Sequence, residues 1–239
     1  MVQGPHDADI ESLPGLGKLR ERLKRGVAGK RFALSMDQGF FAVAEDVQRQ
    51  IEKAVGILEA AGATVEAVDL PWTRVLTDAW NDYWGVFMAG YFGGYLEQWS
   101  DQMDPAVVAL IELGNRLSAV ELKRHEVLRT RQWQDLARIF SSYDALLTPT
   151  AARTAPQAEL RDDAFSSDDE EGRLKGLDMT MTFNFVPQCP AISVPVGLTP
   201  EGLPVGLQVV APRYDDAFAL RVAHTVELAG LMEGRRPTI

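Results

Sequence analysis

Residues 31–68 carry the clearest structural pattern of the chain, RFALSMDQGFFAVAEDVQRQIEKAVGILEAAGATVEAV. A short apolar run at residues 32–36 is typical of a buried strand. Apolar residues then recur at helical spacing from Val47 to Ala61 and stop at Gly62, while residues 64–68 alternate with period two. Strand, helix and strand in this order predict a parallel, right-handed βαβ unit whose sheet is covered by helices.

The rest of the chain extends this pattern to a larger sheet. Residues 72–140 mix polar and apolar positions at helical spacing and predict a helical insertion. A strand is expected at residues 143–147, and two more strands, at 191–194 and 205–210, flank a Gly/Pro turn as in a hairpin. Asp215 precedes a last amphipathic helix. We therefore expect a single α/β domain with a mixed sheet flanked by helices.

Two segments favour irregular structure. Residues 1–17 are dense in turn formers and predict a linker. Residues 159–172 are strongly acidic, so that charge repulsion predicts an extended, mobile loop, and their spacing does not fit a calcium-binding loop.

Composition excludes several classes of function. A single cysteine, Cys189, excludes an internal disulfide, and the three histidines lack the spacing of metal ligands, so we expect neither a metal nor a cofactor. The net charge of -10 opposes direct nucleic-acid binding. The longest apolar run, of about six residues, is far too short to cross a membrane, which needs roughly 20. The first residues do not resemble a signal peptide, and a cytoplasmic location is the expectation.

The residues alone give weak catalytic signals. The chain contains no Gly-x-Ser-x-Gly elbow, P-loop or dinucleotide fingerprint. The serine pairs at 141–142 and 166–167 lie in polar junctions that favour capping or loop roles. Aromatic residues crowd positions 80–92, and they are either anchors in the core or the apolar wall of a small-molecule pocket.

Three blocks near the end carry a family resemblance: YDALLTPT at 143–150, CPAISVPVG at 189–197 and GLPVGLQVV at 202–210. Their order and spacing, followed by the helix at 215–227, resemble the C-terminal blocks of the amidase-signature family. The resemblance also reaches the Gly4-Pro5 segment, so it covers essentially the whole chain and implies the C-terminal half of the amidase-signature fold.

The resemblance implies hydrolysis or transfer of an amide through an acyl-serine intermediate. In the family, a serine is activated by a second serine in a cis peptide and by a lysine, and these residues belong to segments that precede Met1 here. No catalytic residue is therefore assigned to this chain. The implied partners are the N-terminal half of the amidase, on the same or a separate polypeptide, a small-molecule amide substrate and a possible homodimer. The alternative is a non-catalytic scaffold or binding subunit derived from the same fold.

The segment 178–184 resembles one that lines the substrate pocket in the family. Thr and Asn also bond readily to nearby backbone, so they equally fit a role in bracing a helix. Because the segment holds no Arg or Lys, we expect a neutral, partly apolar amide. The predicted substrate-binding residues are Trp80, Trp84, Phe87, Asp178, Thr180, Thr182 and Asn184.

Overall fold

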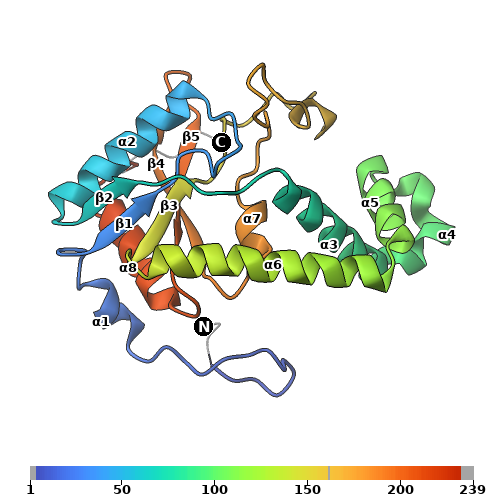
Figure 1. Ribbon diagram of the computed structural model, residues 1–239, viewed down its shortest axis with the longest axis horizontal. Coiled ribbons are helices and arrows are strands. Elements are labelled where there is room, and N and C mark those ends of the chain that lie inside the picture. The colour runs from blue at the N-terminus through green and yellow to red at the C-terminus, as the bar shows by residue number, and fades with distance from the viewer. Residues whose placement is uncertain (1–3, 161, 233–239) are drawn as a thin grey trace.

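The computed structural model describes residues 4–160 and 162–232, and its centre is a five-stranded mixed sheet (Figure 1). The strand order is β2-β1-β3-β5-β4. The first three of these strands are parallel, and the last two form the expected antiparallel hairpin. Their bounds are β1 (Arg31–Leu34), β2 (Thr64–Ala67), β3 (Ala145–Pro149), β4 (Ala191–Leu198) and β5 (Pro204–Val210). The expected α/β fold with a mixed sheet is confirmed.

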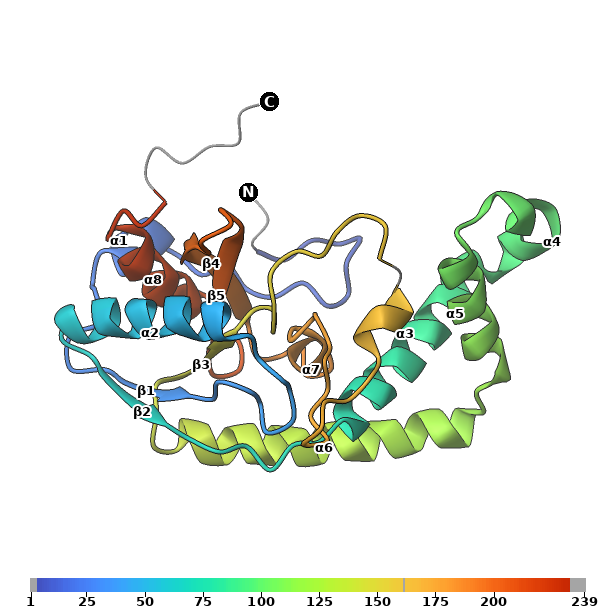
Figure 2. The same cartoon turned by 90° about the horizontal axis from the view of Figure 1, so that it is seen from above.

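Helices cover both faces of the sheet because successive strand residues point to opposite sides. On one face, Phe32 and Leu147 pack against α2 (Glu45–Ala60) and α8 (Asp216–Glu227). On the other face, Ala33 and Leu146 pack against a cluster that includes Leu136. The βαβ unit predicted from residues 31–68 is present, with α2 as its connecting helix (Figure 2).

The chain between β2 and β3 is helical, as expected. Its helices are α3 (Val75–Phe92), α4 (Leu96–Trp99), α5 (Pro105–Arg116) and α6 (Ala119–Phe140), with 3-10 turns η1 (Gly93–Tyr95) and η2 (Ser100–Gln102). The α4–α5 end of this section projects away from the sheet (Figure 2). The C-terminal end of α6 packs against the sheet, where Leu136 is fully buried.

Two capping groups fix the long helices in place. Ser118 Oγ accepts a hydrogen bond from the Glu121 amide at 3.2 Å, and Glu121 Oε2 accepts one from the Ser118 amide at 2.9 Å, which closes a capping box at the start of α6. Asp215 accepts from the Phe218 amide at 3.2 Å and caps α8, as its sequence position predicts.

The shorter elements are α1 (Leu19–Leu23), the 3-10 turn η3 (Asp162–Phe165) and α7 (Met181–Asn184). The expected linker, residues 1–17, contains only turns and an isolated bridge between His6 and Asp9 in its described part, with residues 1–3 outside the described range. No described helix combines the length and hydropathy needed to cross a bilayer.

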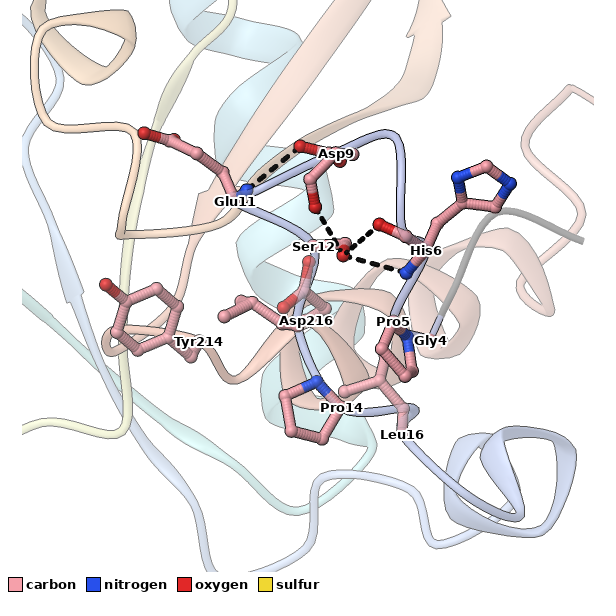
Figure 3. Close-up of a pocket in the computed structure, with 11 residues that line it drawn as sticks. Gly4, Pro5, His6, Asp9, Glu11, Ser12, Pro14, Leu16, Tyr214 and Asp216 are labelled. Carbon is pink, nitrogen blue, oxygen red and sulfur yellow. Dashed lines mark hydrogen bonds between the residues drawn. The ribbon is translucent and has the colours of Figure 1, made fainter.

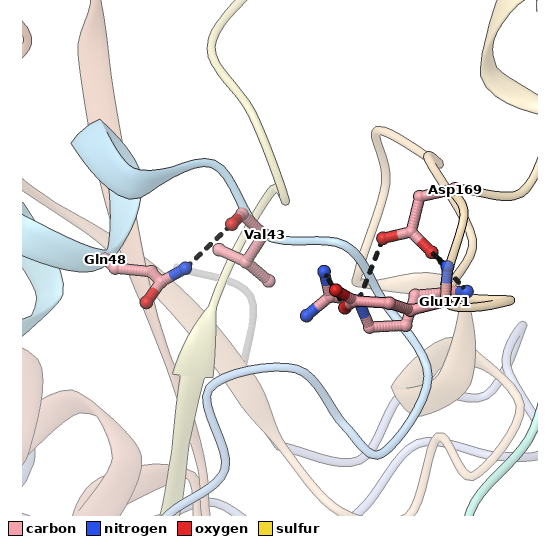
Figure 4. A network of polar contacts seen from close by, with 5 residues as sticks. Val43, Gln48, Asp169 and Glu171 are labelled. Atoms are coloured by element: carbon pink, nitrogen blue, oxygen red, sulfur yellow. Dashed lines mark hydrogen bonds and ion pairs between the residues drawn. The ribbon is translucent and has the colours of Figure 1, made fainter.

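The second half of the acidic segment is a turn rather than an extended chain (Figure 4). The Asp169 carboxylate accepts hydrogen bonds from the amides of Glu171 and Arg173, at 3.0 and 2.8 Å, and from Arg173 Nε at 2.9 Å. Leu174 then bonds to the backbone of Phe40 and Ala42. Local arginine and amide donors thus offset the repulsion that the sequence alone suggested. Arg161 lies outside the described residues.

Candidate substrate pocket

An apolar pocket of about 260 Å³ lies between α3 and the chain that follows α7. Spacings of three and four residues place the aromatic side chains of α3 on one face of that helix. The pocket is lined by Trp80, Tyr83, Trp84, Phe87, Arg129, Asn184, Phe185 and Pro187. The structure therefore brings together four of the predicted site residues, Trp80, Trp84, Phe87 and Asn184.

The aromatic rings of α3 that line the pocket stack on one another along the helix. Trp84 and Phe87 lie nearly parallel with ring centroids 4.9 Å apart, and Trp80 stacks on Trp84 at 6.0 Å. Tyr83 meets Phe185 edge to face at 5.7 Å, which ties the helix to the core. Trp84 and Phe87 remain 39% and 43% exposed. These two residues form an open wall, whereas Trp80 and Tyr83 also pack against the core.

The segment 178–184 contributes less to the pocket than expected. Thr182 is fully buried, where its hydroxyl donates to Gln38 Oε1 at 2.7 Å. Asp178 accepts a hydrogen bond from the Thr180 amide at 2.7 Å, and Asn184 Nδ2 approaches Thr180 Oγ1 at 3.4 Å. Of the four, only Asn184 lines the pocket. The other three occupy positions that brace the single-turn helix α7, the alternative role that their residue types allow.

A second hollow, of about 190 Å³, adjoins the first at Arg129. Its lining includes Trp133, Gln188, Cys189 and Arg213. The sequence did not predict Arg129 and Arg213 as pocket residues, because both lie far along the chain from residues 178–184. The four-residue spacing of Arg129 and Trp133 is the one signal that places them on a common helix face.

Cys189 does not fit the role of a nucleophile. Burial raises the pKa of its thiol to about 11, and the nearby charge of Arg213 offsets this only in part. At neutral pH the side chain is therefore a protonated thiol, which is neither a good nucleophile nor a metal ligand.

The sequence model of the amidase family matches residues 1–220. This chain belongs to the amidase family. Among curated relatives, it is 33% identical to a glutamyl-tRNA(Gln) amidotransferase subunit of Exiguobacterium, over 87% of this chain and 46% of the relative. It is 27% identical to an acylamidase of Rhodococcus erythropolis, over 99% of this chain and 50% of that protein. The chain thus spans about half the length of these relatives.

Solved structures agree on the fold of this amidase-family chain. A bacterial aryl acylamidase of the amidase-signature family superposes with a TM-score of 0.83, at 24% identity, over 98% of this chain and 52% of the other. The glutamyl-tRNA(Gln) amidotransferase subunit of Thermotoga maritima gives a TM-score of 0.59, at 24% identity, over 94% of this chain and 48% of the other. Both comparisons support the expected half of the amidase-signature fold.

A third, more open hollow beneath the N-terminal segment brings Ser12, His6 and Asp9 together (Figure 3). These amino-acid types form hydrolase triads, but their geometry here is different. Ser12 Oγ bonds to the backbone of His6 and Asp9, and His6 Nδ1 accepts from the Ala8 amide at 3.2 Å. In Figure 3 the His6 ring points away from Ser12. The serine therefore has no base within this set.

The two other histidines of this amidase-family chain, and Ser193, contact neighbouring side chains. His125 Nε2 lies 2.7 Å from Asp82 Oδ2, which links α6 to α3, and His224 Nδ1 lies 3.2 Å from Glu227. Ser193 Oγ shares a hydrogen bond with Thr150 Oγ1 at 2.7 Å. Within residues 4–160 and 162–232, no three His, Cys, Asp or Glu side chains gather as a metal site requires.

Proposed function

We propose that this chain is part of an enzyme that hydrolyses a carboxylic-acid amide to the acid and ammonia or an amine. In that enzyme the chain contributes part of the sheet and one wall of the substrate pocket. The observation that carries the proposal is the open aromatic wall of α3 beside Asn184, in a chain of the amidase family. Apolar walls with a few polar groups are typical of small-molecule sites.

The acyl transfer itself requires residues that the described part of this chain does not bring together. A serine hydroxyl attacks the amide carbonyl, the amine leaves, and water then cleaves the acyl-serine to release the acid. We infer that the serine, its bridging serine and the lysine come from an N-terminal half, on the same or a separate polypeptide. The polar contacts of Ser12 and Ser193 support this, because each hydroxyl bonds to groups that do not act as bases.

The alternative is a scaffold or binding subunit without catalysis. Within the described residues no serine hydroxyl bonds to a histidine or lysine side chain, and the one bonded to a carboxylate, Ser118 with Glu121 at 2.7 Å, belongs to the capping box of α6, which favours the scaffold. The polypeptide that co-purifies with this chain separates the two functions, because a partner that supplies a nucleophilic serine and a lysine supports the enzyme. A partner without them supports the scaffold.

The proposal is tested by assaying the protein, together with whatever co-purifies, against aryl, alkyl and amino-acid amides. We expect Trp84→Ala and Phe87→Ala to raise KM with little effect on kcat, since these side chains bind the substrate remote from the scissile bond. Tyr95→Ala is the matched control, because Tyr95 is 54% exposed and lies outside the pocket. Absence of hydrolysis throughout the panel, by the chain together with a partner that supplies the nucleophilic serine and the lysine, would reject the enzyme in favour of the scaffold.

A further inference from the structure

The aromatic pocket and the hollow beside it meet at Arg129 and differ in character. The first, of about 260 Å³, has mainly aromatic walls. The second, of about 190 Å³, is lined by the guanidinium-bearing side chains of Arg129 and Arg213, together with Thr130 and Gln188. The lining of the two together contains no Asp or Glu. In a chain with a net charge of -10, this pair of hollows is locally cationic.

Each arginine rests on an aromatic ring. The Arg213 guanidinium carbon lies 4.2 Å from the centre of the Trp133 ring, and that of Arg129 lies 5.6 Å from the centre of the Tyr83 ring. Such stacking restricts the guanidinium but leaves its N–H groups available at the edge. Neither arginine forms an ion pair within the described residues. The Glu126 carboxylate pairs with Lys123 at 2.8 Å, and the charge of Arg129 also helps to lower the pKa of Glu126.

The backbone holds the second arginine at the site. The Tyr214 amide donates to the Gln188 carbonyl at 2.9 Å, which joins the turn that bears Arg213 to the loop that follows α7. Tyr214 has a φ of 63°, a left-handed conformation that is uncommon for residues other than glycine. Such a conformation persists only where surrounding contacts maintain it. These contacts therefore hold the turn that bears Arg213 in one position.

We propose that the two hollows bind one ligand, an amide that carries a carboxylate and an apolar group. The apolar group lies against Trp84 and Phe87, and the carboxylate accepts hydrogen bonds from Arg129 and Arg213. Guanidinium groups suit this purpose because they offer paired N–H donors to the two oxygens of a carboxylate. As a statement about the substrate, the inference rests on the proposed function, and it replaces the neutral amide expected from residues 178–184.

Two probes without an amide bond test the ligand class directly. 3-Phenylpropanoate is an anion with an aromatic ring, and 3-phenylpropan-1-ol is its neutral counterpart. Titration calorimetry of the protein with each probe is expected to show the anion binding at least about 10-fold more tightly, because charge-assisted hydrogen bonds exceed neutral ones by that margin. Arg129→Gln and Arg213→Gln each abolish most of this preference, because they weaken binding of the anion more than binding of the alcohol.

Arg131→Gln is the control variant, because it removes the same charge from the same helix at an exposed position outside both hollows. It is expected to leave the affinities for both probes as in the wild type. Equal binding of the two probes by the wild-type protein, or no binding of either, overturns the inference even if a variant fails to fold. Anion preference without amide hydrolysis would reject the proposed function alone, and hydrolysis without anion preference would reject this inference alone.

Discussion

Gly114 determines how closely α3 and α5 approach one another. A Cβ atom added to Gly114 would overlap the carbonyl group of Gly85 and lie 2.7 Å from the Val86 nitrogen, and these are backbone atoms that cannot rotate away. We expect Gly114→Ala to lower the free energy of unfolding by about 1–3 kcal/mol, as overpacking does. Urea denaturation monitored by tryptophan fluorescence measures the change.

Gly90→Ala on the exposed side of α3 is the control for this substitution. A Cβ atom there has no neighbour within 4 Å, so alanine is expected to stabilise the helix by up to about 1 kcal/mol. Destabilisation by Gly90→Ala equal to that by Gly114→Ala would show that the close approach of the two helices does not account for the effect of Gly114→Ala.

Thr182 provides a second test at the scale of one residue. Its hydroxyl donates to Gln38 Oε1 at 2.7 Å, while Gln38 Nε2 donates to the Met179 carbonyl at 2.8 Å, all inside the core. Thr182→Val keeps the shape but leaves the Gln38 oxygen unpaired, which costs about 1–3 kcal/mol of stability. Denaturation measures this loss.

Thr180→Val is the comparison, since the half-buried Thr180 hydroxyl has only a 3.4 Å contact with Asn184, and its loss is expected to cost no more than about 0.5 kcal/mol. If Thr182→Val left the stability unchanged but altered KM, Thr182 would be a substrate-binding residue, as the sequence predicted.

The strands and helices show how far the sequence predicts this fold. Periodicity located β1, α2, β2 and the hairpin of β4 and β5, because each of these elements buries one face against the core. It did not reveal that Thr182 is buried, because α7 is a single turn and its orientation depends on contacts with Gln38 and Gln132. The contribution of Arg129 depends on tertiary packing of α6, which the local sequence does not encode.

The carboxylate of Asp144, the residue before β3, makes the stability of the protein depend on pH. Burial alone would raise the pKa of Asp144, but bonds from Lys30 Nζ at 2.7 Å and the Arg31 amide at 2.9 Å outweigh it and lower the pKa. A lowered folded-state pKa contributes stability that is full above the unfolded value of about 3.9 and is lost as the pH falls below it. The wild-type protein is thus expected to lose its advantage over Asp144→Asn as the pH falls through this window.

Thermal unfolding of both proteins between neutral and acid pH measures the effect. Asp101→Asn serves as the control, because Asp101 is exposed and forms no ion pair within the described chain. A stability difference between the wild-type protein and Asp144→Asn that stays constant at acid pH would contradict the assigned ionic contact.

At the scale of the whole molecule, the sheet presents surfaces that suit a further layer or strand. Within the described residues, β4 pairs with β5 on one side only. Ala191, Ser193 and Pro195 of β4 are exposed on one face of the sheet. Because the chain spans about half of its curated relatives, we infer that the N-terminal half named in the proposed function would cover this region. Unpaired edges of this kind otherwise promote aggregation.

The proposed division of the enzyme into two halves predicts that residues 1–239 alone do not hydrolyse amides. Loss of even one oxyanion-hole donor reduces rates by about 10²- to 10³-fold, and here the nucleophile and its base are also expected from the other half. Purified residues 1–239 should therefore neither turn over the amide panel nor react with a fluorophosphonate probe. Adding the N-terminal half should restore both activities and place the label on that half. Stoichiometric labelling of a serine in residues 1–239, with matching turnover, would instead locate the active site in this chain.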